Sequence, residues 1–179
     1  MLVGDLVKFF RDKFVGGKLT PGVLASSRIA FPLSLHGESL VWQPPSARIS
    51  QSADQSLGTD MTQLDLGQLD WDSAEMWDST APKILTAPLA GIYYVFGQVQ
   101  TNNTANVGMR LEVRVNSDSG VYQTKGEDTE VDGFNSLAAG WQVRLEVGDT
   151  LALYGETSGA RTAAEDRCFL GATLIAPEP

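Results

Sequence analysis

The amino-acid sequence predicts an all-β protein: an antiparallel sandwich of about eight to ten strands, preceded by an amphipathic helix and an extended arm. From residue 47 onward, short apolar segments are separated by turn residues about every 8 to 12 positions, which is typical of sandwiches and barrels. The clearest of these segments alternate apolar with charged side chains. We therefore divide the 179 residues into an arm, 1–46, and a β domain, 47–179.

Residues 2–15 have apolar side chains at helical spacing and charged ones opposite, and the glycines at 16–17 end the pattern. A helix this apolar needs a cover, which could be the β domain of the same chain, a partner protein or, less readily, a membrane surface. We favour a partner protein. The expected anchor residues are Leu2, Leu6, Phe9, Phe10 and Phe14.

The segment 19–46 carries Pro21, Pro32, Pro44 and Pro45 among short apolar pieces. Proline fixes φ and removes a backbone donor, so it excludes long helices and central strands. The segment is expected to be extended. The pair Pro44–Pro45 marks the boundary with the β domain.

Two strands of the β domain are clear from their period of two. In 109–115 and 141–147 the apolar side chains face one way and charged or polar ones the other, which predicts one face on a core and one in solvent. Residues 149–156 and 167–175 are more continuously apolar, which predicts strands covered on both faces.

Composition excludes several classes of function. A net charge of −9 argues against a basic nucleic-acid-binding face. No apolar run approaches the ~18–20 residues of a membrane span, and the charged first fifteen residues do not resemble a signal peptide. The single cysteine, Cys168, excludes an intrachain disulfide and is interpreted as a buried apolar residue.

The residues offer little chemistry. The only histidine, His36, lies in the arm, and no phosphate-binding glycine loop occurs, so we expect neither an enzyme nor a cofactor. Two acidic runs, 70–78 and 127–132, lack the spacing of a calcium-binding loop and are interpreted as solvated loops. The weak candidates for a cation site are Asp70, Asp72, Glu127 and Asp128.

The tryptophans and one aromatic strand indicate where a partner could bind. Trp141 lies on an apolar strand face and is assigned to the core, whereas Trp71 and Trp77 lie in an acidic, irregular segment. Those two favour a subunit interface, where tryptophan is enriched, over a sugar platform. The strand within 87–103 adds Tyr93, Tyr94 and Phe96 as possible interface residues. Its alternating sets, Val95 and Val99 against Tyr94 and Phe96, are expected to divide between the core and an interface, with the two faces unassigned.

The order of several motifs carries a resemblance that covers residues 50–175. These motifs are Pro88 followed by Gly91-Ile92-Tyr93, the strand and turn at 109–117, Gly148-Asp149 before Leu151 and Leu153, and Phe169-Leu170-Gly171 before Leu174 and Ile175. In this order they resemble the globular head of the complement first component, which shares its fold with tumour necrosis factor. The resemblance implies a ten-stranded jelly roll that assembles as a homotrimer.

Three departures accompany the resemblance. Val95 stands where the family usually has phenylalanine, Asn116 is followed by Ser117 rather than glycine, and no collagen stalk is present. Jelly rolls of this type without stalk or disulfides also resemble virion proteins of tailed bacteriophages. That resemblance implies a structural, non-enzymatic capsid decoration (cement) protein on the capsid surface. Its arm would bind the major capsid protein, and it would contact neither nucleic acid nor membrane.

Two alternatives remain at this stage. One is a receptor- or glycan-binding tip of a head or tail fibre, with Trp71, Trp77 or Tyr122 stacking on a sugar. The other is a glycan hydrolase on the same fold, which lacks any supporting motif.

Overall fold

A computed structural model describes residues 33–36, 39–102, 108–127 and 134–178. The chain divides into two compact units, Met1–Phe31 and Pro32–Pro179. The expected helix at 2–15 and its anchor residues lie outside the described residues.

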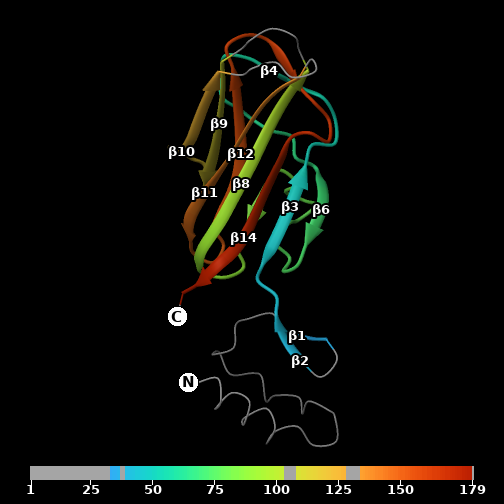
Figure 1. Cartoon of the computed structure of the whole chain (residues 1–179), viewed down its shortest axis with the longest axis vertical. Helices are drawn as coiled ribbons and strands as arrows, with labels where there is room; N and C mark the ends of the chain where they lie inside the picture. Colours follow the sequence, from blue (N-terminus) through green and yellow to red (C-terminus); the bar gives the residue numbers. More distant parts are fainter. Residues whose placement is uncertain (1–32, 37–38, 103–107, 128–133, 179) are drawn as a thin grey trace, which may run out of the picture. The chain divides into compact units, whose positions relative to one another are not determined.

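The described residues form strands and loops only, so the all-β prediction is confirmed (Figure 1). We expected about eight to ten strands from residue 47 onward, but the described residues form twelve from Ser46 onward. The surplus is explained by pairings of two or three residues, which are too short to show a period in sequence. The strands are β1 Leu33–His36, β2 Ser39–Trp42, β3 Ser46–Ser50, β4 Gln55–Leu57, β5 Thr62–Gln63, β6 Gln68–Asp72, β7 Leu85–Thr86, β8 Gly91–Asn102, β9 Gly108–Val115, β10 Asp118–Glu127, β11 Phe134–Leu145, β12 Thr150–Thr157, β13 Arg161–Ala163 and β14 Phe169–Pro177.

Part of the expected extended arm is a β-hairpin. Strand β1 pairs with β2 in antiparallel register, from Leu33 opposite Trp42 to His36 opposite Ser39. Prolines flank this stretch but do not interrupt it, so its backbone donors remain free to pair. The sandwich itself begins with β3 at Ser46, one residue before the predicted boundary.

The sandwich consists of two antiparallel sheets. The larger sheet has seven strands, in which β11, β8, β14, β3 and β6 lie side by side and the short β13 and β4 extend from the end of β8. The smaller sheet has five strands, in which β10, β9 and β12 lie side by side and β12 also pairs with β5 and β7. Figure 1 shows the long β8 crossing the sandwich with β14 beside it. Consecutive strands of one sheet are thus often distant in sequence.

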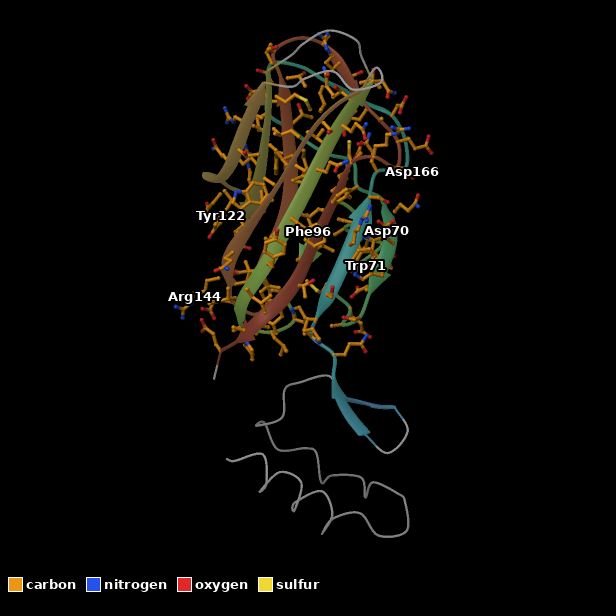
Figure 2. The ribbon with its side chains drawn as sticks, viewed as in Figure 1. Asp70, Trp71, Phe96, Tyr122, Arg144 and Asp166 are labelled. Carbon is orange, nitrogen blue, oxygen red and sulfur yellow. The ribbon has the colours of Figure 1, made fainter. Side chains whose placement is uncertain are left out.

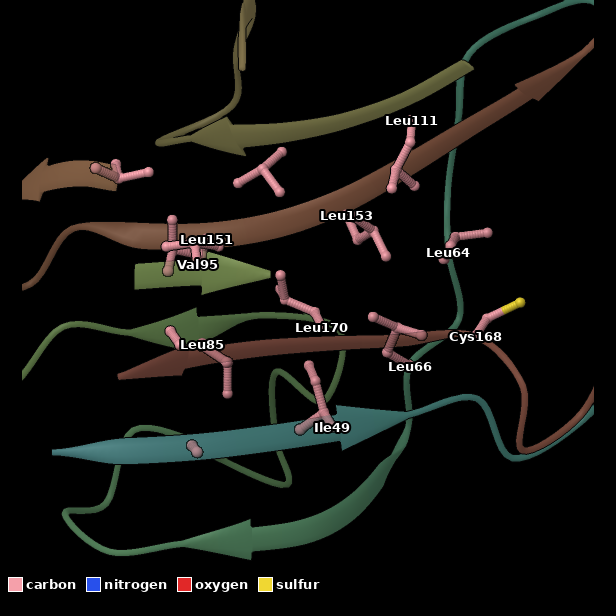
Figure 3. Packing of buried hydrophobic residues seen from close by; sticks show 14 of the residues in the cluster. Ile49, Leu64, Leu66, Leu85, Val95, Leu111, Leu151, Leu153, Cys168 and Leu170 are labelled. Carbon is pink, nitrogen blue, oxygen red and sulfur yellow. The ribbon is translucent and has the colours of Figure 1, made fainter. Parts of the chain in front are cut away.

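The core lies between the two sheets and is formed by alternate residues of each long strand. Along β8 the inward residues Tyr93, Val95 and Val99 are fully buried. Leu111, Val113, Leu151 and Leu153 of the smaller sheet belong to the same buried cluster, in which Figure 3 labels Val95, Leu111, Leu151 and Leu153. Trp141 packs against this core, as predicted. The faces of β8 that the sequence left unassigned are therefore settled: Tyr93 points in, and Tyr94 points out.

The charged face of β9 differs from the prediction in one respect. Arg110, Glu112 and Arg114 do point away from the core, but Glu112 is fully buried. Arg114 Nε lies 2.6 Å from Glu112 Oε1, and Arg110 Nη2 lies 3.5 Å from Glu112 Oε2. The two long arginine side chains cover the shorter glutamate between them, so an outward position is not a solvated one.

Candidate functional site

Among the described residues, six large apolar side chains are more than a third exposed, and most of them lie on strands of the larger sheet. Five of them lie on strands of the larger sheet: Leu69 and Trp71 on β6, Ile92 and Tyr94 on β8, and Ile175 on β14. The sixth, Val147, lies in the turn between β11 and β12. A patch concentrated in this way is typical of an interaction surface.

Two glycines let aromatic rings lie flat on this outer face. Phe96 is opposite Gly140 of β11 on one side and Gly171 of β14 on the other. A Cβ on Gly171 would collide with the Phe96 ring, and a Cβ on Gly140 would collide with the Tyr94 hydroxyl group. Missing side chains on the neighbouring strands thus leave room for the rings beside β8.

The aromatic side chains form a continuous row across the sheet. The ring centroids of Tyr94 and Phe96 are 6.0 Å apart, and those of Phe96 and Phe169 are 6.1 Å apart. The Arg48 guanidinium carbon is 4.1 Å from the Phe169 ring centroid and 5.5 Å from that of Trp71. We call these five residues the aromatic row. It runs from β8 over β14 and β3 to β6, and Figure 2 labels Phe96 and Trp71 at two points along it.

The charge of this row is balanced within the chain. Arg48 Nε lies 2.9 Å from Asp70 Oδ2, and Ser50 donates a hydrogen bond to Asp70 Oδ1. Strands β8 and β14 contain no charged residue, although the whole chain has a net charge of −9. The face is therefore nearly neutral on an acidic protein, and two copies could approach here without strong repulsion.

The predicted interface residues fall into two groups. Trp71, Tyr94 and Phe96 lie in the aromatic row, on one face. Tyr93 is fully buried, and its hydroxyl group donates to the Leu89 carbonyl, so it offers no surface to a partner. Trp77 is half-buried against the core and donates from Nε1 to the Pro82 carbonyl. The burial of Tyr93 corrects its place among the predicted interface residues, and it depends on pairing of β8 with strands distant in sequence, whereas the interface role of Trp77 stays a prediction.

Sequence reasoning missed Arg48 and Phe169, the middle of the row. The available signal was the continuously apolar run at 167–175, which predicts a strand covered on both faces. In the single chain, β14 leaves Phe169 half-buried and Ile175 47% exposed. One face of this run is therefore only partly covered within the chain.

Two of the predicted cation-binding residues have other partners, and the other two lie outside the described part of the structure. Asp70 pairs with Arg48, and Asp72 accepts hydrogen bonds from the backbone N–H groups of Ala74 and Trp77. The Glu127 side chain and Asp128 lie outside what the structure describes. In the described part of the chain no three metal-binding side chains come together.

Nearby acidic and phenolic groups have structural roles. Hydrogen bonds from Thr80 lower the pKa of Asp78, which organises a surface turn. Burial raises the pKa of Tyr93, and its hydrogen bond to Leu89 partly opposes that. Tyr122 packs against the core, so among the three expected sugar platforms Trp71 is the most exposed.

Cys168 is fully buried at one end of the core (Figure 3). Burial raises the pKa of its thiol to about 11. At neutral pH the thiol is therefore protonated and unreactive, which agrees with the interpretation of Cys168 as a buried apolar residue.

Among the described residues, no helix is long and apolar enough to cross a bilayer.

No family model matches the chain, and no curated protein matches it in sequence. Solved structures do match. An Eiger TNF structure from S. frugiperda superposes with a TM-score of 0.56 at 17% identity, over 76% of this chain and 96% of that one. Murine APRIL superposes with a TM-score of 0.56 at 14% identity, over 74% of this chain and 100% of that one. The globular domain of zebrafish complement 1qA superposes with a TM-score of 0.53 at 12% identity, over 75% of this chain and 99% of that one. The fold is therefore the jelly roll of the tumour necrosis factor and complement globular-head type.

Proposed function

We propose that this chain is a homotrimeric structural knob in which the outer face of the larger sheet is the surface where copies meet. The observation that carries the proposal is the aromatic row, together with the uncharged strands β8 and β14 around it. Interface centres are depleted in charge and enriched in aromatic residues and arginine, which matches this composition.

The fold supports three copies rather than two. The sequence motifs resemble a family that assembles as trimers, and the solved structures share its jelly roll. Sedimentation velocity and light scattering of the purified chain should give the mass of three chains. A monomer at micromolar concentration would overturn the proposal.

We further propose that the knob is a capsid decoration protein on the virion surface, bound to the major capsid protein through the arm, 1–46. Support comes from the sequence, which combines an apolar N-terminal pattern with a proline-rich segment and has no shaft repeat. Three arms on one trimer would add their separate affinities through effective concentration. The proposal assigns no catalysis and no cofactor to the chain.

Deletion of residues 1–45, which leaves β3 intact from Ser46, tests this role. The truncated chain should remain trimeric but fail to bind capsids in a pelleting assay, with the full chain as the positive control. If the truncated chain still decorates capsids, the arm is not the anchor. Electron microscopy of whole particles would show whether the knob lies on a shell or on a tail.

One observation favours a second candidate, a receptor- or glycan-binding tip. Trp71 is 44% exposed, and the hydrogen-bonding groups of Arg48 and Asp70 lie beside it. An aromatic ring next to planar polar groups is suited to a sugar. Glycan-array binding that Trp71→Ala abolishes, while the chain stays trimeric, would favour this role over decoration.

A further inference from the structure

One end of the core is polar although it is fully buried. The inward residues of β8 are apolar up to Val99, but the last inward position is Thr101. In the larger sheet Thr101 is opposite Asn135 of β11 on one side and Ala163 of β13 on the other. Thr101, Asn135 and Gln51, which follows β3, are all 0% exposed.

Hydrogen bonds hold Gln51 at this polar end of the core. Its backbone N–H donates to the Cys168 carbonyl, and its carbonyl accepts from the Asp166 N–H. The side-chain Nε2 donates to the Ala53 carbonyl at 2.6 Å and to the Ala163 carbonyl at 3.3 Å. Because both acceptors are carbonyl oxygens, they fix the orientation of the amide and leave Oε1 on the other side.

Two of these buried atoms lack a hydrogen-bond partner among the described residues: Gln51 Oε1 and Thr101 Oγ1. Buried polar atoms in native proteins nearly always have a partner, from protein or from ordered water. Gln51 reaches Ala163, and Ala163 is opposite Thr101, so both atoms belong to one region.

We propose that this end of the core is an internal hydration site, in which ordered water donates to Gln51 Oε1 and bridges it to the Thr101 hydroxyl group. Buried water of this kind needs two to four polar partners, and the hydroxyl group can either donate or accept. A divalent cation fits less well, because such ions prefer carboxylate ligands and Gln51 and Thr101 supply neutral oxygens only. The water would connect the segment after β3 to the end of β8.

The sign of one mutational effect tests the proposal. Thr101→Val keeps the shape but removes the hydroxyl group. If Oγ1 binds water that also serves Gln51, this change should lower the folding equilibrium constant about tenfold, because a buried polar group then loses its partner. If Oγ1 has no partner, the valine should leave stability unchanged or raise it. That second result would overturn the proposal.

Two further variants complete the urea-denaturation experiment. Thr157→Val removes a buried hydroxyl group that donates directly to the Gly159 carbonyl at 2.7 Å, so it gives the scale for losing one hydrogen bond. In a Gln51→Met background, Thr101→Val should have a clearly smaller effect, because the shared water has already lost its other partner. Additive effects of the two changes would contradict a shared site.

A crystal structure of the full wild-type chain keeps the proposal testable if a variant fails to fold. Water density within hydrogen-bonding distance of both Gln51 Oε1 and Thr101 Oγ1 is the expected result. A direct contact between the two side chains would overturn the proposal. So would a divalent cation, identified by anomalous scattering after manganese is added to the crystal.

Discussion

The outer faces of the two sheets differ in how their side chains find partners. On the smaller sheet, Glu112 is covered by Arg110 and Arg114, Arg110 also pairs with Glu156, and the Arg114 guanidinium carbon lies 3.9 Å from the Tyr154 ring centroid. The charged side chains of β9 are thus paired within the chain. The larger sheet carries the aromatic row, on which Trp71 and Tyr94 are still 44% and 45% exposed. The contrast is that charged side chains on the smaller sheet are paired within the chain, whereas aromatic side chains on the larger sheet stay partly exposed.

The largest expected effect of a substitution is on the outer face of the smaller sheet. Glu112→Ala leaves two arginines without the carboxylate between them, and breaking a buried ion pair in this way costs about 3–5 kcal/mol of folding free energy. Urea denaturation measures the loss. The mass of the folded fraction should stay that of the wild type, because this face is not the proposed interface. If the fully folded variant had a lower oligomer mass than the wild type, the outer face of the smaller sheet would also take part in association, against the comparison of the two faces.

The core between the two faces should lose stability at high pH through Cys168. The thiol pKa is about 11 in the folded chain and 9.0 without burial, so the unfolded chain releases its proton first as the pH rises. Stability is therefore lost between about pH 9 and 11, by about 3 kcal/mol in total. Denaturation curves across this range measure it. The Cys168→Ala variant should show a correspondingly smaller loss, whereas equal pH dependence would exclude the thiol as the cause.

On the outer face of the larger sheet, a single added charge should break self-association without unfolding the knob. Ile92→Asp places a carboxylate on the uncharged β8, and a desolvated unpaired charge is strongly unfavourable in an interface. We expect association to weaken at least tenfold, measured by sedimentation equilibrium. The matched control is Val147→Asp, at an exposed apolar residue in a turn. Equal effects of both variants would remove the distinction between the face and the rest of the surface.

The smallest effect is expected at the margin of the larger sheet. Arg144 Nε lies 2.6 Å from Glu178 Oε1, but the Arg144 side chain is 70% exposed. Exposed ion pairs contribute about 0–1 kcal/mol, so Glu178→Gln should change the unfolding midpoint little. A loss of folding free energy as large as that of Glu112→Ala would show that solvent exposure does not predict how much each ion pair stabilises the fold.

Much of the fold could be predicted because its causes are local. Alternation in 109–115 places Leu111 and Val113 in the core, and the lack of catalytic motifs needs no structure to observe. The short strands β5 and β7 could not be predicted, since two paired residues leave no period to detect.

Sequence by itself determined that the β domain is an antiparallel sandwich and that aromatic side chains lie on both faces of β8. It did not determine which face is covered, because Tyr93 and Tyr94 are chemically the same and only strand order places one inside. Tertiary structure alone brought Arg48 between Phe169 and Trp71, which are far apart along the chain, and buried Glu112 under its neighbours. Such contacts depend on pairings between distant strands, and a period of two cannot encode them.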